Sequence, residues 1–348
     1  MAVQFFGAPL IGDPFHDRRR TGVGGSDAGA ILGVSPHTSR LGVWEDKRGL
    51  RPPTVATERM LWGTRLQDAI LRGYAEDTRT EVTRGRFRRH DRYPFVIGNP
   101  DAEGVRDGKP RLVEVKTTSH LDERWGEEGS EQVPLHYYAQ VQHYLLLRSL
   151  EVGDLTALVG GRELRTYVIP ANPAFQEAML QEEGVFWRLV EDGTPPEPDG
   201  SDDARHALRV LYPSAVPEEV VANEAVAEYA TRYREARERR VAAERDEERW
   251  AQAMQSFMGH RDRLVGPGFR ASWTNRSGSV SWKSAAAEAL TALQFIASAD
   301  DAIPLGTLVD HARETVEGWS ATLERFRGQP SRVFTVTWTA KDGEPTGA

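Results

Sequence analysis

The chain has 348 residues, of which 39% are hydrophobic and 28% are charged, and its formal net charge is −8. These values predict an ordinary soluble globular protein with one large domain or two modest ones. Because the chain has no cysteine, disulfides, thiolate metal sites and a cysteine nucleophile are excluded, and we expect a cytoplasmic protein. Neither a long apolar run nor the pattern of a signal peptide is found, so we expect no membrane association.

Residues 1–200 mix helical and strand patterns. Apolar residues at helical spacing alternate with short β-like runs that end at turn signals. The predicted helices cover residues 27–32, 58–77, 134–150 and 173–193. The predicted strands lie near Phe87 and over residues 93–97, 111–117 and 155–169. This order predicts an α/β fold with a mixed central sheet flanked by helices.

A Pro-rich linker at residues 194–201 suggests two domains, 1–200 and 201–348. Residues 217–258 are highly charged and sparsely apolar, which favours an extended helical arm over a packed core helix. Further β-like and helical stretches follow it, at residues 269–273, 280–282, 284–298, 304–326 and 333–338. We expect this mainly helical C-terminal extension, with its small β element, to serve assembly or partner binding.

One constellation of residues suggests chemistry. Asp101 follows a turn, and Glu114 and Lys116 are two residues apart in a predicted strand, so their side chains share one face. Two carboxylates with the backbone carbonyl of Val115 offer the oxygen ligands that Mg²⁺ or Mn²⁺ prefers. A metal there would activate a water molecule and neutralise phosphate charge, and Lys116 would stabilise the developing negative charge.

Five stretches resemble motifs of the YqaJ-like viral recombinase and phage lambda exonuclease family, within the PD-(D/E)xK nuclease superfamily. They occur in the order of that family, at residues 20–33, 62–69, 98–101, 113–116 and 137–144. The resemblance implies a restriction-endonuclease-like fold with Asp101, Glu114 and Lys116 as catalytic residues. It also implies roles for Gln140 beside the catalytic lysine, for Tyr144 on DNA, and for Arg20 and Ser26 around a 5′-terminal phosphate. Three nearby glycines, Gly22, Gly24 and Gly25, would let the backbone approach that phosphate.

The activity implied by the resemblance is a Mg²⁺-dependent 5′→3′ exonuclease that acts on double-stranded DNA ends. Such an enzyme leaves 3′ single strands for phage-type homologous recombination, uses two metal ions, and works with a single-strand annealing recombinase, in a homo-oligomer, in a bacterial or phage-infected cell. The alternatives are an endonuclease of the same superfamily, or a degenerate DNA-binding or interaction subunit.

The chain departs from the family pattern at two places. The helix position that normally carries a second-metal Glu is Gln67, and Asp68 beside it points elsewhere on a helix. Asp91 is the alternative holder of a second ion. After Asp101, Glu103 either contributes another carboxylate or only lengthens the loop.

Overall fold

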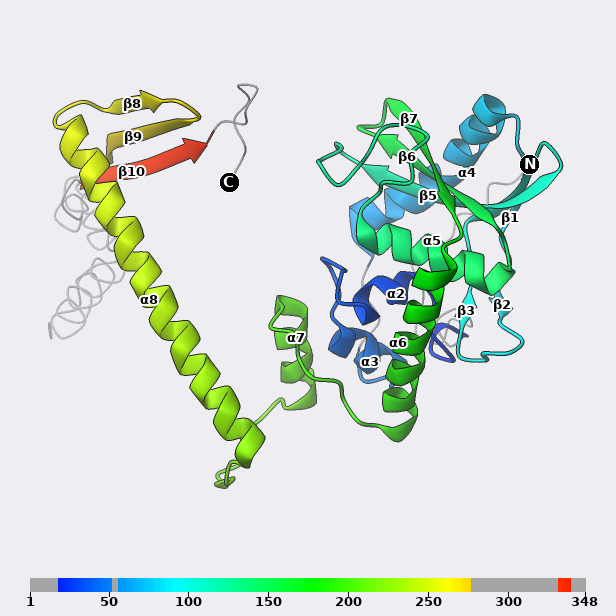
Figure 1. Cartoon of the computed structure of the whole chain (residues 1–348), viewed down its shortest axis with the longest axis horizontal. Helices are drawn as coiled ribbons and strands as arrows, with labels where there is room; N and C mark the ends of the chain where they lie inside the picture. The colour runs from blue at the N-terminus through cyan, green and yellow to red at the C-terminus, as the bar shows by residue number, and fades with distance from the viewer. Residues whose placement is uncertain (1–17, 52–55, 277–330, 339–348) are drawn as a thin grey trace, which may run out of the picture. The chain divides into compact units, whose positions relative to one another are not determined.

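The computed structural model describes residues 18–51, 56–276 and 331–338 (Figure 1). The chain divides into two compact units, Met1–Pro217 and Glu218–Ala348. Each unit is described by itself below.

The first unit is built on a five-stranded sheet of order β1-β4-β5-β6-β7. Its strands are β1 (Glu81–Arg84), β4 (Ala102–Arg106), β5 (Lys109–Thr118), β6 (Val152–Val159) and β7 (Glu163–Pro170). Strands β5 and β6 pair in parallel, whereas the other neighbours are antiparallel. A separate two-stranded ribbon contains β2 (Arg88–Arg89) and β3 (Ile97–Gly98).

Helices cover both faces of this sheet, as Figure 1 shows. Helix α4 (Glu58–Thr78) packs Ile70 and Tyr74 against Val113 and Val115 of β5. Helix α5 (Leu135–Arg148) supplies the crossover that parallel strands β5 and β6 require, and its apolar residues pack on the other face. The expected mixed central sheet flanked by helices is therefore confirmed.

Three more helices form a layer beside α5, in which two of them contact α5 and the third packs on those two. They are α2 (Gly25–Ile31), α3 (Arg40–Lys47) and α6 (Pro173–Asp192). Their core includes Leu41 and Trp44 of α3 and Phe186 of α6. The sequence analysis did not predict α3 or β1, because Gly42 and the charged residues of both segments break the apolar periodicity.

The second unit contains α8 (Glu224–Met258) and a three-stranded antiparallel sheet of order β10-β9-β8. The strands are β8 (Arg263–Gly266), β9 (Phe269–Arg276) and β10 (Ser331–Trp338). The strand expected at 280–282 and the helices expected at 284–298 and 304–326 lie outside the described residues. Within the described ranges, no helix is both long and apolar enough to cross a bilayer.

The first unit extends beyond the Pro-rich linker because helix α7 (Asp202–Leu211) packs against α3. Asp203 accepts hydrogen bonds from the backbone N–H of Ser39 at 2.7 Å and from its hydroxyl at 2.8 Å, and it pairs with Arg51. Ala207 is fully buried in the same contact. The units divide after Pro217, whereas the composition of the sequence placed the division near residue 200.

This packing predicts that a chain ending at Pro217 is more stable than one ending at Gly200. The shorter chain loses the Asp203 interactions and exposes the apolar surface under α7. For a unit of this size, each kcal/mol of unfolding free energy shifts the melting temperature by about 2–4 °C. We therefore expect the melting temperature of the shorter chain to be lower by about 5 °C or more. Thermal unfolding followed by circular dichroism compares the two chains, and equal melting temperatures would contradict the role of α7.

Candidate functional site

Glu114 and Lys116 lie side by side on the face of β5 that is turned toward α5. Side chains alternate along a strand, and Val113 and Val115 take the opposite face, in the core under α4. Lys116 Nζ donates a hydrogen bond to Glu114 Oε1 at 2.8 Å. The Glu114 side chain is buried, with only 3% of the residue exposed. The strand thus places a buried carboxylate beside an ammonium, as the alternation in the sequence predicts.

Asp101 meets β5 where the pairing of β4 with β5 stops. That pairing ends with Ala102 opposite Val113. Past this point, the Val115 N–H donates to Asp101 Oδ2 at 2.8 Å. Because the N–H and C=O of one strand residue point to the same side, the Val115 carbonyl faces the same edge. Two carboxylates and a backbone carbonyl therefore gather at this end of the strand.

Gln140 of α5 joins Glu114 and Lys116 into one hydrogen-bonded network. Its Nε2 donates to Glu114 Oε1 at 2.7 Å, and its Oε1 accepts from Lys116 Nζ at 2.9 Å. One helical turn earlier, the Tyr137 ring lies 5.0 Å from Lys116 Nζ, within the range of a cation–π contact. The lysine is therefore fixed from three directions.

The burial of this site changes how its groups titrate. Burial and, after it, the neighbouring Asp101 carboxylate raise the pKa of Glu114 to about 7. Burial likewise raises the pKa of Asp101, although Lys116 and the Val115 N–H oppose that shift. Burial disfavours the charged form of Lys116, but Glu114 and Asp101 outweigh it and raise the pKa of the ammonium. The two carboxylates therefore have too little positive charge around them to favour their ionised forms, whereas Lys116 stays protonated.

The donor set fits a hard divalent cation. Glu114 Oε2 is buried and has no hydrogen-bond partner among the described residues. A buried oxygen without a donor is costly, and a cation at this position would remove that cost. However, no cluster of three or more acidic or histidine side chains occurs in the described part of the chain. The remaining ligands of such an ion would have to be the Val115 carbonyl, water or phosphate oxygens.

Gln67 of α4 points into this site. Its Nε2 donates to Asp101 Oδ1, the carboxylate oxygen not used by Val115. Asp68 points elsewhere and pairs with Arg84 on the surface, as the helical spacing predicts. A neutral amide thus stands beside Asp101 at the place where a carboxylate would add a third acidic group.

Two other sequence candidates lie outside the site. The Glu103 carboxylate pairs with Arg148 of α5 at 2.9 Å. Asp91 is exposed in the turn between β2 and β3. It forms no acidic cluster with Asp101 and Glu114 among the described residues. The structure therefore does not bring either carboxylate to the candidate metal centre.

Ser26, at the start of α2, lies beside Arg19 and not beside Arg20. The Arg19 guanidinium donates to Ser26 Oγ at 3.1 Å and lies 3.8 Å from Asp27. Arg20 turns toward α3, where it approaches Asp46 at 3.7 Å and the Arg51 carbonyl at 3.5 Å. Successive side chains at the end of a helical turn point about 100° apart, which separates the two arginines. The expected pairing of Arg20 with Ser26 is thus replaced by Arg19 with Ser26.

Tyr144 is buried, and the motif glycines make room for its ring. A Cβ atom on Gly25 of α2 would lie 2.6 Å from the ring, and one on Gly98 of β3 would also lie 2.6 Å from it. Gly22 has a different reason, because a Cβ there would lie 2.4 Å from the Phe95 carbonyl oxygen. Close packing therefore accounts for glycine at Gly22 and Gly25, whereas the sequence suggested an approach of the backbone to phosphate.

His143 and Glu183 form a fully buried pair that sequence reasoning missed. His143 Nδ1 lies 2.8 Å from Glu183 Oε1, and Nε2 lies 2.9 Å from the Ile97 carbonyl oxygen. Both ring nitrogens face acceptors, and although burial opposes the charge, Glu183 raises the pKa of the imidazole. The pair ties α5 and α6 to β3, four residues before Asp101. No spacing in the sequence marks it, because the two residues are forty positions apart.

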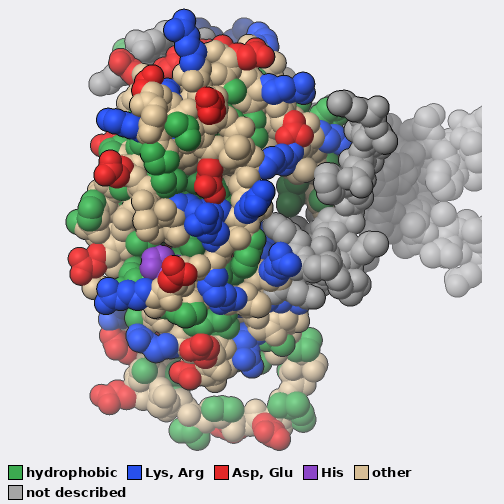
Figure 2. All heavy atoms as spheres, turned by 90° about the vertical axis from the view of Figure 1, so that its right-hand side faces the viewer, with side chains coloured by type: hydrophobic (Ala, Val, Ile, Leu, Met, Phe, Trp, Pro, Cys, Tyr) green, Lys and Arg blue, Asp and Glu red, His purple; other side chains and the backbone are tan. Residues whose placement is uncertain are grey.

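Basic side chains cover the side of the first unit on which β1 and β2 lie. Figure 2 shows Lys and Arg side chains across this face, with Asp and Glu interspersed. The arginines of the cluster at β1 to β3 are exposed, namely Arg84, Arg86, Arg88, Arg89 and Arg92. The net negative charge of the chain therefore does not prevent a locally basic surface.

Comparison with known proteins shows what this part of the chain is similar to. Residues 14–149 match the family model of the YqaJ-like viral recombinase domain. This range contains Asp101, Glu114, Lys116, Gln140 and Tyr144. The resemblance seen in the motifs is therefore confirmed for residues 14–149.

Three individual proteins are similar to parts of this chain. The uncharacterized protein YqaJ of Bacillus subtilis (strain 168) is 31% identical over 205 residues, which are 58% of this chain and 63% of that protein. An alkaline exonuclease from Laribacter hongkongensis matches at 15% identity and a TM-score of 0.42, over 52% of this chain and 93% of that one. A phage-related exonuclease from Haemophilus somnus 129PT matches at 10% identity and a TM-score of 0.38, over 51% and 99%.

Proposed function

We propose that the chain is a Mg²⁺-dependent deoxyribonuclease. The observation that carries this proposal is the buried Glu114 carboxylate, whose Oε2 has no hydrogen-bond partner among the described residues, beside Asp101 and Lys116. Other buried carboxylate oxygens in the described part of the chain, such as Asp154 Oδ1 and Glu183 Oε2, also lack a partner, but Glu114 Oε2 belongs to a site in which Asp101 and the Val115 carbonyl offer further ligands to the same ion. The match to the YqaJ-like domain supports the same conclusion.

In this proposal Asp101, Glu114 and the Val115 carbonyl hold the ion. When bound, Mg²⁺, or Mn²⁺ in its place, supplies an activated water molecule and neutralises charge on the scissile phosphate. Lys116 carries three N–H donors, of which Glu114 and Gln140 take two. Its third donor is directed to an oxygen of the substrate, where it stabilises developing negative charge. Gln140 and Tyr137 keep the lysine in place.

The direction and substrate of the enzyme follow from the family resemblance. We infer that it degrades one strand of double-stranded DNA ends 5′→3′ and leaves 3′ single strands for a single-strand annealing recombinase. We place it in the cytoplasm of a bacterial or phage-infected cell. Incubation with linear and circular duplex DNA tests this inference. Consumption of linear DNA alone supports it, cleavage of both forms indicates an endonuclease, and cleavage of neither indicates a degenerate subunit.

The first prediction on activity concerns the two carboxylates and the lysine. Asp101→Asn and Glu114→Gln should lower kcat by about a thousandfold or more, because each removes an ion ligand. Lys116→Ala should lower kcat about a hundredfold to a thousandfold without weakening the binding of Mn²⁺ measured by calorimetry. Glu103→Gln is the matched control, since Glu103 pairs with Arg148, and its activity should stay within about twofold. Full activity in any of the first three variants would contradict the site.

The second prediction concerns Gln67, which donates to Asp101 and leaves a second ion without a third carboxylate. Gln67→Glu supplies that ligand and should lower the Mg²⁺ concentration for half-maximal rate about threefold to tenfold. Asp68→Asn is the control, because Asp68 pairs with Arg84 on the surface. An unchanged or higher Mg²⁺ requirement in Gln67→Glu would mean that this position does not serve an ion.

The third prediction concerns the 5′ end of the DNA. Arg19 and Ser26 together offer a guanidinium fork and a hydroxyl, which suit a terminal phosphate. Duplexes with a 5′-phosphate should therefore be degraded about tenfold faster than duplexes with a 5′-hydroxyl. Arg19→Ala should remove this difference, whereas Arg20→Ala should keep it, because Arg20 lies against α3. Equal rates on both ends in the wild type would rule out the pocket.

A further inference from the structure

Helix α8 is a long helix that packs on little else in the described structure. It runs from Glu224 to Met258, and Met258 is its one buried residue. At 1.5 Å per residue it is about 50 Å long. Asn223 caps its N-terminus, and ion pairs between residues four apart stabilise it along its length.

The apolar residues of α8 follow a heptad spacing. Of the ten positions that are alternately three and four residues apart from Val226 to Phe257, the spacing of a coiled-coil seam, eight carry apolar residues and two near the middle carry Arg240 and Glu247. The ten seam residues are Val226, Tyr229, Tyr233, Ala236, Arg240, Ala243, Glu247, Trp250, Met254 and Phe257. Tyr233 is 71% exposed, Trp250 is 60% exposed and Phe257 is 75% exposed. Large aromatic side chains thus line one face of a helix that is otherwise charged.

The seam is complementary to a second α8 that lies beside it in the opposite direction. In an antiparallel pair, the first and last seam residues face each other, so Val226 lies opposite Phe257 and Tyr233 opposite Trp250. Toward the middle, Ala236 lies opposite Glu247. Val226 and Met254 therefore each face an aromatic residue, whereas Ala236 and Ala243 face the aliphatic stems of the charged residues Glu247 and Arg240.

The charges beside the seam favour the same arrangement. Arg237 falls opposite Glu244 of a second copy on one flank, and Arg239 falls opposite Asp246 on the other. Within the seam, Arg240 lies one layer from Glu247 of the second copy. A parallel pair would instead place Arg240 against Arg240 and Glu247 against Glu247, which is unfavourable in a partly buried seam.

We propose that the heptad face of α8 is an interface between two copies of this chain, joined as an antiparallel helical pair. The occupant is a second α8, because both the seam and its flanking charges are complementary to their own reversed sequence.

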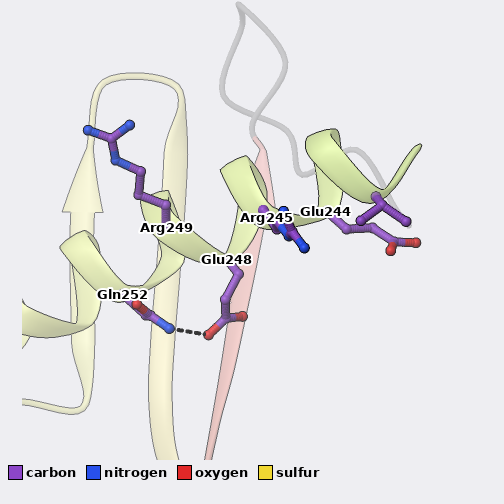
Figure 3. A pocket seen from close by; sticks show the side chains of 6 residues that line it. Glu244, Arg245, Glu248, Arg249 and Gln252 are labelled. Atoms are coloured by element: carbon purple, nitrogen blue, oxygen red, sulfur yellow. Dashed lines mark hydrogen bonds between the residues drawn. The ribbon is translucent and has the colours of Figure 1, made fainter. Parts of the chain in front are cut away.

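The other sides of α8 do not compete for this role. A shallow hollow on the helix contains no seam residue; it is lined by Arg245, Glu248, Arg249 and Gln252, with the flanking residue Glu244 at its edge (Figure 3). Gln252 donates to Glu248 there at 2.8 Å, and most of the side chains that line the hollow are charged. Charge changes at Arg245 therefore provide a control that leaves the seam and its flanks intact.

Charge reversal in the full chain tests the interface. Sedimentation equilibrium of the wild type should show a dimer that dissociates on dilution. In Arg237→Glu, each new glutamate faces Glu244 of the other copy, so like charges meet at two symmetry-related places. This change should raise the dissociation constant of the dimer about tenfold. The double variant R237E/E244R restores the opposite charges and should return the constant to within about threefold of the wild type. Arg245→Glu, the matched control, should have no effect, and circular dichroism reports helix content in every variant.

Distances between the two copies test the antiparallel direction. The chain has no cysteine, so a single introduced cysteine carries one spin label per copy. In the antiparallel pair, the two Thr231→Cys positions lie about 30 Å apart along the helix axis, whereas the two Ala242→Cys positions lie at the same level and are separated only by the width of the pair, about 20 Å. Pulsed electron paramagnetic resonance should measure one long and one short distance. A monomer, two short distances, or no effect of Arg237→Glu on dissociation would overturn the proposal.

Discussion

The hydrogen bond from the Val115 N–H to the Asp101 carboxylate joins the two halves of the candidate site. It forms because β4 stops pairing with β5 at Ala102, which leaves the next backbone groups of β5 for a side chain. Asp101 is held on the other side by the turn that follows β3. Strand β3 is fixed in turn by Val23 and by the imidazole of His143. The short motifs around α2, β3 and α5 are thus parts of one support for a single carboxylate.

This support makes it possible to bury two carboxylates that repel each other. Burial alone would raise the pKa of both, and Glu114 reaches about 7. Lys116 and Gln140 satisfy only one Glu114 oxygen, Oε1, and leave Oε2 without a donor in the described structure. Folding carries this cost, and such uncompensated groups are typical of places where function limits stability. A site that is incomplete in this way is prepared to receive positive charge.

The sequence predicted the parts of the site that depend on strand alternation. Glu114 and Lys116 share a face because they are two residues apart, and the PD-(D/E)xK pattern located Asp101. The sequence did not predict which arginine contacts Ser26, because that depends on side-chain orientation at the end of a helical turn. In the structure it is Arg19 and not Arg20. Sequence reasoning also missed His143 with Glu183, and the packing of α7 on α3, because these contacts join distant segments. Local periodicity carries no information about which distant surfaces meet.

The second unit presents the opposite physical problem, because it exposes apolar surface where the first buries charge. The i,i+4 ion pairs of α8 are enough to favour a solvated helix, and aromatic residues on its surface add nothing to that. The stability of the helix therefore does not explain why Tyr233 and Trp250 are exposed on its surface. Along the seam and its flanks, the charged residues are basic before Val241 and acidic after it. A second surface complements this pattern only if it runs in the opposite direction. The composition of α8 thus follows from recognition of another surface and not from the stability of the helix.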